Sequence, residues 1–273
     1  MSFVEAVLLG IVQGLTEFLP ISSSGHLRIV PALLGWDDPG AGFTAVVQLG
    51  TMAAVLVYFW SDLWEIGTTW LRSLVDRDLR SHPSARLGWY LIVATIPIGI
   101  LGLSFDDQIE TGARDLRIIA SALILLGLGL GIADRMGSQA KTMDHLRPRD
   151  GILIGVAQSL ALIPGVSRSG ATISAGLLAG YTRADAARFS FLLSVPAVVL
   201  SGLYQLPDAT SADGAGVVAT AVATIAAFIS GYAAIAWLLR WLTTHSTAVF
   251  VIYRVALGGL VWVLLLVGTL EPT

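Results

Sequence analysis

The sequence contains no cysteine, so disulfide bridges and thiolate metal sites are excluded. Charge is also scarce: 13% of the 273 residues are Asp, Glu, Lys or Arg, whereas soluble domains usually carry about 25%. The formal net charge of −3 leaves no basic excess of the kind that nucleic-acid binding requires. These shortages argue against an ordinary soluble domain and against a nucleic-acid partner.

Several catalytic signatures are missing as well. No HExxH, zinc-finger spacing, Walker loop or GxSxG elbow occurs, which argues against zinc proteolysis, nucleotide-driven transport and the α/β-hydrolase mechanism. The opening residues, Met1-Ser-Phe-Val-Glu5, form no basic region, and no small-residue cleavage pattern follows the first apolar stretch. A removable signal peptide is therefore not expected.

Apolar residues are abundant instead. They make up 55% of the chain, and the mean hydropathy is +0.77. Several apolar runs approach the roughly 20 residues that a helix needs to cross a bilayer. The runs cover residues 42–60, 87–104, 116–133, 186–206, 216–239 and 248–268. The sequence predicts an all-α integral membrane protein with about six transmembrane helices.

Two polar segments interrupt the apolar pattern, and they nearly repeat one another 145 positions apart. The identities are Gly10, Gln13, Leu15, Ser22, Ser24 and Gly25, which recur as Gly155, Gln158, Leu160, Ser167, Ser169 and Gly170. Polar interruptions repeated in two halves of an apolar chain are typical of broken helices that meet at a site within the membrane. Such backbone is tolerated at that depth only inside protein or beside a water-filled cavity.

Residues 3–35 and 150–180 are therefore predicted to be re-entrant hairpins. Three predicted spans separate the two hairpins, and an odd number of spans reverses the second repeat relative to the first. We expect a single membrane domain over residues 1–273, built from two inverted halves of about 1–135 and 150–273.

Basic residues gather at the loops and span ends on one side of this arrangement. They are Arg72, Arg77, Arg80, Arg86, Arg135, Lys141, Arg147, Arg149, Arg183 and Arg240. The opposite loops carry Arg114 and Arg117 among the acidic residues Asp106, Asp107, Glu110, Asp208 and Asp213. Because arginine-rich loops tend to stay in the cytoplasm, we expect both termini and the mouth of the first hairpin to be extracytoplasmic.

The first hairpin holds the candidate reactive groups. Gln13 and Glu17 lie four residues apart, so a helix points both into one cavity. A carboxylate at membrane depth costs about 2.5 to 3.5 kcal/mol on insertion scales, which marks Glu17 as a functional candidate. The alternative is that Glu17 makes only a packing hydrogen bond or an ion pair inside the bundle.

A serine cluster and a histidine follow Glu17. Pro20 ends the first half-helix, and the hydroxyls that can cap the second belong to Ser22, Ser23 and Ser24. Hydroxyls, free backbone N–H groups and the positive end of a helix together make an anion site. His26 adds an imidazole, the side chain that most readily transfers protons near neutral pH, with a structural role as the alternative.

The second hairpin supplies a cation. Arg168 offers a fixed fork of donors that matches phosphate oxygens. Further hydroxyls come from Ser167, Ser169 and Thr172. If the hairpins meet, Arg168 faces Ser23; the alternative is that Arg168 only neutralises Glu17 and locks the hairpins together. Arg254, alone in the last predicted span, is expected to form a structural pair or to snorkel.

The two motifs together resemble a known family. They read Gln13-x-x-x-Glu17-Phe-Leu-Pro20-Ile-Ser-Ser23-Ser-Gly25-His26 and Pro164-Gly-Val-Ser167-Arg168-Ser169-Gly170-Ala-Thr172. This pattern is similar to the undecaprenyl-pyrophosphate phosphatase family of bacteria, the bacitracin-resistance type, over essentially the whole chain. The resemblance implies hydrolysis of undecaprenyl pyrophosphate to the monophosphate, which recycles the lipid carrier for cell-wall synthesis.

By position, the resemblance assigns catalysis to Glu17, Ser23, His26 and Arg168. We expect the substrate phosphates to contact Gln13, Ser22, Ser24, Ser167, Ser169 and Thr172. The resemblance also implies a divalent cation, Mg2+ or Ca2+, with Glu17 as a possible ligand. It further implies a homodimer in the bacterial cytoplasmic (inner) membrane, with the site open to the extracytoplasmic side. The first acidic position of the family is often Glu but is Gln13 here, so Glu17 must supply the anionic function by itself.

Two assignments of the nucleophile are open. In one, Ser23 attacks and His26, oriented or charge-balanced by Glu17, takes its proton; in the other, His26 attacks and Glu17 activates the water that clears the phosphohistidine. Two other functions compete. A transporter or flippase for a phosphorylated isoprenoid lipid fits inverted re-entrant repeats. The acid-phosphatase type of lipid phosphatase fits poorly, since it needs a His where Ser174 stands.

Overall fold

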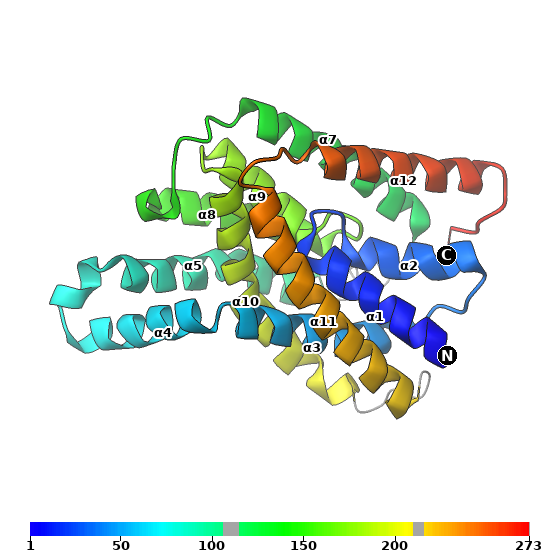
Figure 1. Ribbon diagram of the computed structural model, residues 1–273, viewed down its shortest axis with the longest axis horizontal. Helices are drawn as coiled ribbons and strands as arrows, with labels where there is room; N and C mark the ends of the chain where they lie inside the picture. The colour runs from blue at the N-terminus through cyan, green and yellow to red at the C-terminus, as the bar shows by residue number, and fades with distance from the viewer. Residues whose placement is uncertain (106–114, 210–215, 273) are drawn as a thin grey trace.

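The computed structural model describes residues 1–105, 115–209 and 216–272, and its regular elements there are helices, with one isolated β-bridge between Lys141 and Tyr181 (Figure 1). The α-helices are α1 (Phe3–Phe18), α2 (Ser23–Leu34), α3 (Gly40–Tyr58), α4 (Trp60–Val75), α5 (Pro83–Ser104), α7 (Leu116–Met136), α8 (Pro148–Ser159), α9 (Arg168–Leu178), α10 (Arg183–Ala209), α11 (Val217–Trp241) and α12 (Ala248–Leu266). The short 3-10 helices are η1 (Asp78–Ser81), η2 (Met143–His145) and η3 (Leu160–Leu162). The predicted all-α fold is confirmed.

The long apolar helices agree with most of the predicted spans. Within the described residues, α5, α7, α11 and α12 are each long and apolar enough to cross a membrane. A fifth candidate is the pair α3 and α4, whose axes differ by 76° across the break at Phe59. The predicted span 186–206 falls within α10, where the side chains from 198 onward lie outside the described part. The number of six spans stays a prediction.

The helix α4 is an element that the apolar pattern did not indicate. It turns only Ile66 and Ser73 fully inward, while Trp60 and Trp64 are each 64% exposed. It packs along α5, and Figure 1 shows this pair reaching away from the other helices. An amphipathic helix that exposes tryptophan is typical of a segment at a membrane interface.

Helices that correspond in the two sequence repeats have corresponding neighbours. The helix α1 packs on α11, and its counterpart α8 packs on α5; likewise α3 contacts α11, and α10 contacts α5. The repeated glycines explain the closest of these contacts. A Cβ at Gly10 would lie 2.3 Å from the Ala223 carbonyl oxygen, and one at Gly155 would lie 2.5 Å from the Ala94 carbonyl oxygen. Both glycines are required because a side chain would force the two backbones apart.

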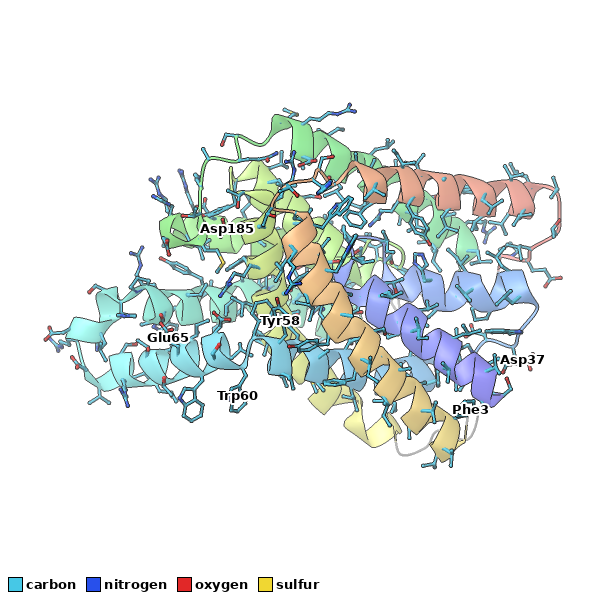
Figure 2. The ribbon with its side chains drawn as sticks, in the orientation of Figure 1. Phe3, Asp37, Tyr58, Trp60, Glu65 and Asp185 are labelled. Atoms are coloured by element: carbon cyan, nitrogen blue, oxygen red, sulfur yellow. The ribbon has the colours of Figure 1, made fainter. Side chains whose placement is uncertain are left out.

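The chain termini and the α4–α5 pair lie at opposite ends of the molecule (Figure 1). Both chain termini lie at one end in Figure 1, and the tip of the α4–α5 pair lies at the other. Figure 2 places Phe3 and Asp37 at the end with the termini, and Glu65 and Asp185 toward the opposite end. Five residues of the predicted extracytoplasmic loops, Asp106, Asp107, Glu110, Arg114 and Asp213, lie outside the described residues, as does the side chain of Asp208.

Candidate active site

The two repeated motifs fold into the same local backbone. Ser22 precedes α2 with φ of 79°, and Ser167 precedes α9 with φ of 72°. Each serine caps its helix, because the Oγ of Ser22 accepts from the Gly25 N–H at 3.3 Å and the Oγ of Ser167 accepts from the Gly170 N–H at 3.1 Å. Positive φ is rare at residues other than glycine, and such strain is concentrated at functional sites.

The second serine of each motif pairs with the first. The Oγ atoms of Ser22 and Ser24 lie 3.3 Å apart, and those of Ser167 and Ser169 lie 3.1 Å apart. Ser169 also donates to the Leu19 carbonyl oxygen at 3.2 Å. This last bond ties the second hairpin directly to the first, 150 positions earlier. The hairpins therefore meet, as the repeat predicts.

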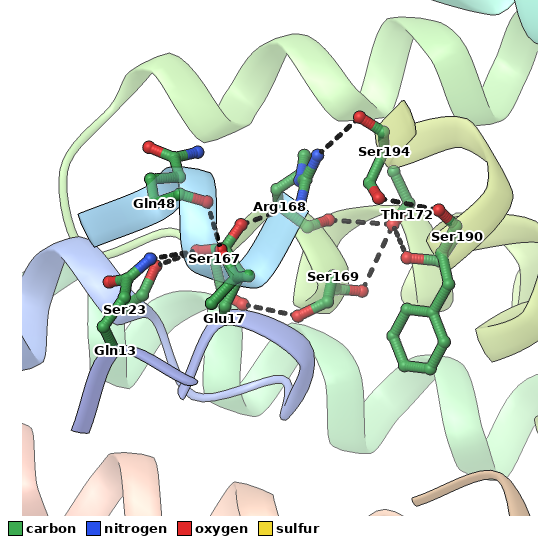
Figure 3. A network of polar contacts seen from close by, with 12 residues as sticks. Gln13, Glu17, Ser23, Gln48, Ser167, Arg168, Ser169, Thr172, Ser190 and Ser194 are labelled. Carbon is green, nitrogen blue, oxygen red and sulfur yellow. Dashed lines mark hydrogen bonds and ion pairs between the residues drawn. The ribbon is translucent and has the colours of Figure 1, made fainter. Parts of the chain in front are cut away.

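Glu17 is the centre of the polar network shown in Figure 3. Its Oε1 accepts from Arg168 Nη2 at 2.7 Å, which joins α1 to α9. Its Oε2 accepts from the Ser23 hydroxyl at 2.6 Å and from the Gln13 amide at 3.2 Å. A single buried carboxylate therefore contacts the candidate nucleophile on one oxygen and the candidate phosphate-binding arginine on the other.

Arg168 is held from a second direction as well. Its Nη1 donates to the Ser194 carbonyl oxygen of α10 at 3.2 Å. Arginine has five N–H donors, and the bonds to Ser194 and Glu17 are the two that the described residues provide. The side chain is 15% exposed. Its other donors are accordingly available to an anion beside Glu17.

These groups line a cavity of about 250 Å³ between the hairpins, α3, α5 and α10. Seven of the residues expected from the sequence are in its wall: Gln13, Glu17, Ser22, Ser23, Ser24, Ser167 and Arg168. Ser169 and Thr172 are not. Thr172 lies 2.6 Å from the Ser190 hydroxyl and donates to the Arg168 carbonyl oxygen at 2.8 Å, so it braces α9 against α10.

His26 also stands apart from this cavity wall. It is 4% exposed, its Nδ1 lies 2.7 Å from the Ser22 carbonyl oxygen, and its Nε2 lies 2.6 Å from the Tyr253 hydroxyl. Because a carbonyl oxygen only accepts, the proton is on Nδ1 and the hydroxyl of Tyr253 donates to Nε2. The two rings stack with an interplanar angle of 9°. Within the described residues, the His26 ring makes no hydrogen bond with Ser23 or Glu17.

Two polar cavity residues were missed by the sequence reasoning. Thr44 and Gln48 of α3 line the wall with the hairpin residues. They lie four positions apart in the predicted span 42–60, so they share one helix face. That spacing of two polar side chains in an apolar run was the signal available in the sequence.

One buried acceptor in the cavity wall has no hydrogen-bond partner among the residues that the structure describes. Gln13 is 1% exposed, and its Oε1 makes no hydrogen bond with the described residues. A buried polar atom left in this state costs about 1 to 3 kcal/mol, so a ligand that engages it is favoured. Gln13 Oε1 and the adjacent Glu17 carboxylate are oxygen donors of the kind that Mg2+ and Ca2+ prefer. The donor set fits a hard divalent cation, although the described residues contain no cluster of three or more acidic, His or Cys ligands.

Comparison with known proteins agrees with the motif resemblance. The family described as bacitracin resistance protein BacA matches residues 6–260. A protein of Kineococcus radiotolerans named undecaprenyl-diphosphatase is 57% identical over 272 residues, covering 99% of this chain and 96% of the relative. Proteins with the same name from a Nocardioides species and from Thermobifida fusca are 55% and 54% identical, and the alignments cover 98% and 100% of this chain and 98% and 93% of those relatives. The chain therefore belongs to the BacA family.

Proposed function

We propose that this protein is an undecaprenyl-diphosphatase, which hydrolyses undecaprenyl pyrophosphate to undecaprenyl phosphate and inorganic phosphate. Relatives that bear this name share more than half of its residues over nearly the whole chain. The observation that carries the proposal in this chain is the pair of contacts made by Glu17. Its two carboxylate oxygens hold the Ser23 hydroxyl at 2.6 Å and the Arg168 guanidinium at 2.7 Å within one cavity.

The geometry favours Ser23 as the nucleophile and Glu17 as its general base. Ser23 Oγ attacks the terminal phosphorus while its proton passes to Glu17 Oε2. The new O–P bond forms as the phosphoanhydride bond breaks, and undecaprenyl phosphate leaves with the electron pair on its oxygen. Glu17 then releases the serine proton to solvent and is a carboxylate again. Water attacks the phosphoserine while Glu17 accepts the water proton and returns it to Ser23 Oγ as the serine O–P bond breaks, so inorganic phosphate is released and the Ser23 hydroxyl is restored.

Charge stabilisation comes mainly from the second hairpin. In phosphoryl transfer the enzyme acts by positioning and by neutralising charge on the equatorial oxygens. Arg168 offers unused N–H donors, the hydroxyls of Ser24 and Ser167 line the same wall, and the N-termini of α2 and α9 begin there. A terminal phosphate that engages Arg168 competes with Glu17 for the guanidinium, which frees the carboxylate to act as a base.

His26 has a supporting role in this scheme. Both of its ring nitrogens are engaged, one with the Ser22 carbonyl and one with Tyr253, and it is absent from the cavity wall. Its contact with Ser22 stabilises the strained residue that precedes Ser23. These contacts of His26 support the serine scheme, with Glu17 in place of His26 as the base.

A divalent cation, Mg2+ or Ca2+, belongs to the same proposal. Glu17 and the unpartnered Gln13 Oε1 are the residues that would hold it. When bound, such an ion supplies positive charge that neutralises the pyrophosphate. Gln13 would then act as a neutral ligand and would orient Glu17 through its amide N–H.

The membrane and the side on which the site opens are also part of the proposal. We place it toward the extracytoplasmic side of a bacterial cytoplasmic (inner) membrane, in a domain of two inverted halves. The support is the separation of the termini from the α4–α5 end, which carries Arg72, Arg77, Arg80 and Arg86. A homodimer rests on the family resemblance alone.

The direct test is phosphate release from undecaprenyl pyrophosphate by the purified protein in detergent with Mg2+ or Ca2+. We expect release by the wild type and none above background by Ser23→Ala. The competing function, transfer of a phosphorylated isoprenoid lipid between leaflets, is measured in liposomes. Leaflet transfer without any phosphate release would overturn the proposal.

A further inference from the structure

Arg254 is a fully buried cation in the last helix. It lies in α12 and is 0% exposed, so it does not snorkel to a membrane surface. No described carboxylate forms an ion pair with it, and the expected structural pair is therefore absent from the part of the chain that the structure covers. Arginine in this setting is costly unless its N–H groups are satisfied, and an unexplained charge at membrane depth points to a functional role.

Within the described part of the chain, Arg254 donates only to backbone carbonyl oxygens. Its Nε donates to Leu123 at 3.1 Å, and its Nη1 donates to Pro20 at 3.0 Å. Its Nη2 has three acceptors, which are the carbonyl oxygens of Ala122 at 3.2 Å, Gly165 at 3.0 Å and Val166 at 3.0 Å. The guanidinium therefore contacts three separate segments of the chain at once.

Two of these segments are the turns of the hairpins. Pro20 lies in the turn between α1 and α2, two residues before Ser22. Gly165 and Val166 lie in the turn before α9, and Val166 directly precedes Ser167. Turns that follow a helix leave carbonyl groups without intrahelical partners. One fork of donors satisfies both turns and fixes the distance between them.

The surrounding glycines make room for this arrangement. A Cβ at Gly170 would lie 3.1 Å from Arg254 Nη1, and a Cβ at Gly127 would lie 3.0 Å from Arg254 Cβ. Gly165 has φ of +86°, and a Cβ there would lie 2.6 Å from the Ile119 carbonyl oxygen. The packing of the second turn is thus built closely around the guanidinium and α7.

We propose that Arg254 is a positioning residue that holds the two hairpin turns in register, so that Ser23 of one hairpin faces Arg168 of the other. This role rests on the proposed function. Arg254 is not part of the cavity wall, and it acts through the backbone that carries Ser22 and Ser167. The two hairpin motifs supply the side chains proposed to contact the substrate, whereas Arg254 keeps the two motifs aligned.

The decisive variant is Arg254→Lys, which keeps the charge but replaces the planar fork by a single ammonium that cannot span both turns. We expect kcat to fall by about tenfold to a hundredfold, since small misplacements of reacting groups have effects of that size. Arg240→Lys, on the exposed end of α11, is the matched control and keeps the wild-type kcat. In Arg254→Ala, added guanidinium restores part of the rate and methylammonium does not.

A distance measurement separates alignment from activity. The chain has no cysteine, so spin labels at Leu15→Cys and Ile163→Cys, which are 39% and 47% exposed, report the spacing of the two hairpins. We expect a narrow distribution with Arg254 and a broader one in Arg254→Lys. A wild-type distribution or a wild-type kcat in the folded Arg254→Lys protein would overturn the proposal.

Two further arms keep the test decisive. If Arg254→Lys does not fold, Gly127→Ala takes its place, because the added methyl group lies 3.0 Å from Arg254 Cβ and displaces that side chain. A broader distance distribution in Gly127→Ala supports the positioning role of Arg254, and an unchanged distribution contradicts it. If the wild type releases no phosphate, the proposed function fails, while the spin-label distances still decide whether Arg254 aligns the hairpins.

Discussion

The two hairpins have the same backbone and different side chains. Both begin a helix with a strained serine cap and a paired second serine. They differ at three positions, because Glu17 corresponds to Leu162, Ser23 to Arg168, and His26 to Ala171. In the proposed mechanism the first hairpin carries the base and the nucleophile, and the second carries the arginine that binds the phosphate. In this proposal the two hairpins share one backbone frame, and the side chains that differ between them carry out the reaction.

Replacing the nucleophile should have the largest effect. In Ser23→Ala, we expect kcat to fall by about 10³-fold or more, a loss comparable to removal of the nucleophile in other hydrolases. The matched control is Ser24→Ala, since Ser24 lines the same wall but does not contact Glu17. Steady-state phosphate release measures both. Equal losses of kcat in the two variants would contradict the assignment of Ser23 as the nucleophile.

Removal of the proposed base, Glu17, should have the second-largest effect on kcat. Glu17→Gln keeps the shape and loses the proton acceptor, so we expect kcat to fall by about 10²- to 10⁴-fold. Its counterpart in the other hairpin provides the control: Leu162→Gln adds the same amide at the corresponding position and should cost less than about tenfold. If both changes act alike, the hairpins are functionally equivalent and the assignment of Glu17 is wrong.

Weakening the clamp should have an intermediate effect that falls on both kinetic constants. In Arg168→Lys, the point charge remains but the fork that spans Glu17 and a phosphate is lost. We expect kcat/KM to drop by about 10- to 100-fold, corresponding to roughly 1.4 to 2.8 kcal/mol. An unchanged kcat/KM would mean that Arg168 serves only as the counterion of Glu17, which was the alternative suggested by the sequence.

The change at His26 should be smaller and separates the two nucleophile schemes. Asn places an amide N–H near the position of Nδ1, so His26→Asn keeps the donor to the Ser22 carbonyl and loses the bond to Tyr253. We expect a loss in kcat of about tenfold or less, comparable to the loss of one supporting hydrogen bond. Tyr253→Phe, which removes the same bond from the other side, should behave alike. Abolished turnover in His26→Asn would restore His26 as a reacting group.

Substitution of the strained caps should be the mildest change. Glycine adopts positive φ without strain but loses the hydroxyl that caps α9 in Ser167→Gly. These two effects oppose one another, so we expect the free energy of unfolding to change by less than about 1 kcal/mol. Ser22→Gly should behave in the same way. Thermal unfolding of both variants tests whether the two hairpin backbones are equivalent. A large loss of stability in only one variant would show that they are not.

The sequence predicted the frame and most of the cavity wall because those features depend on local patterns. The serine caps, the break at Pro20 and the cavity position of Gln13 follow from residue type and from the repeat. The ion pair of Arg168 with Glu17 was expected only as the alternative to an Arg168 that faces Ser23. The sequence did not predict which oxygen of Glu17 meets which partner. The separation of His26 from Glu17 also escaped it, because the direction of a side chain one turn into a helix depends on what packs there, in this case Tyr253 from a distant helix.

Long-range partners were the hardest to foresee. Arg254 is a lone charge in an apolar run, and nothing near it in the chain indicates that its partners are the carbonyl groups of residues 20, 165 and 166. Backbone acceptors carry no sequence signature, since every residue has one. Gln48 could have been found from its spacing to Thr44. The amphipathic helix α4 was missed because its polar residues interrupt the apolar run. Its two faces become evident only from which of its side chains are exposed in the structure.

The central claim is that Ser23 of the first hairpin takes the phosphoryl group. It is tested most directly by rapid acid quench of the enzyme with substrate labelled in the terminal phosphate, followed by peptide mapping. We predict acid-stable label on the peptide that contains Ser23, which appears within the first turnover and is lost as phosphate is released. Acid-labile label on His26, or stable label on Ser167 of the other hairpin, would contradict the assignment.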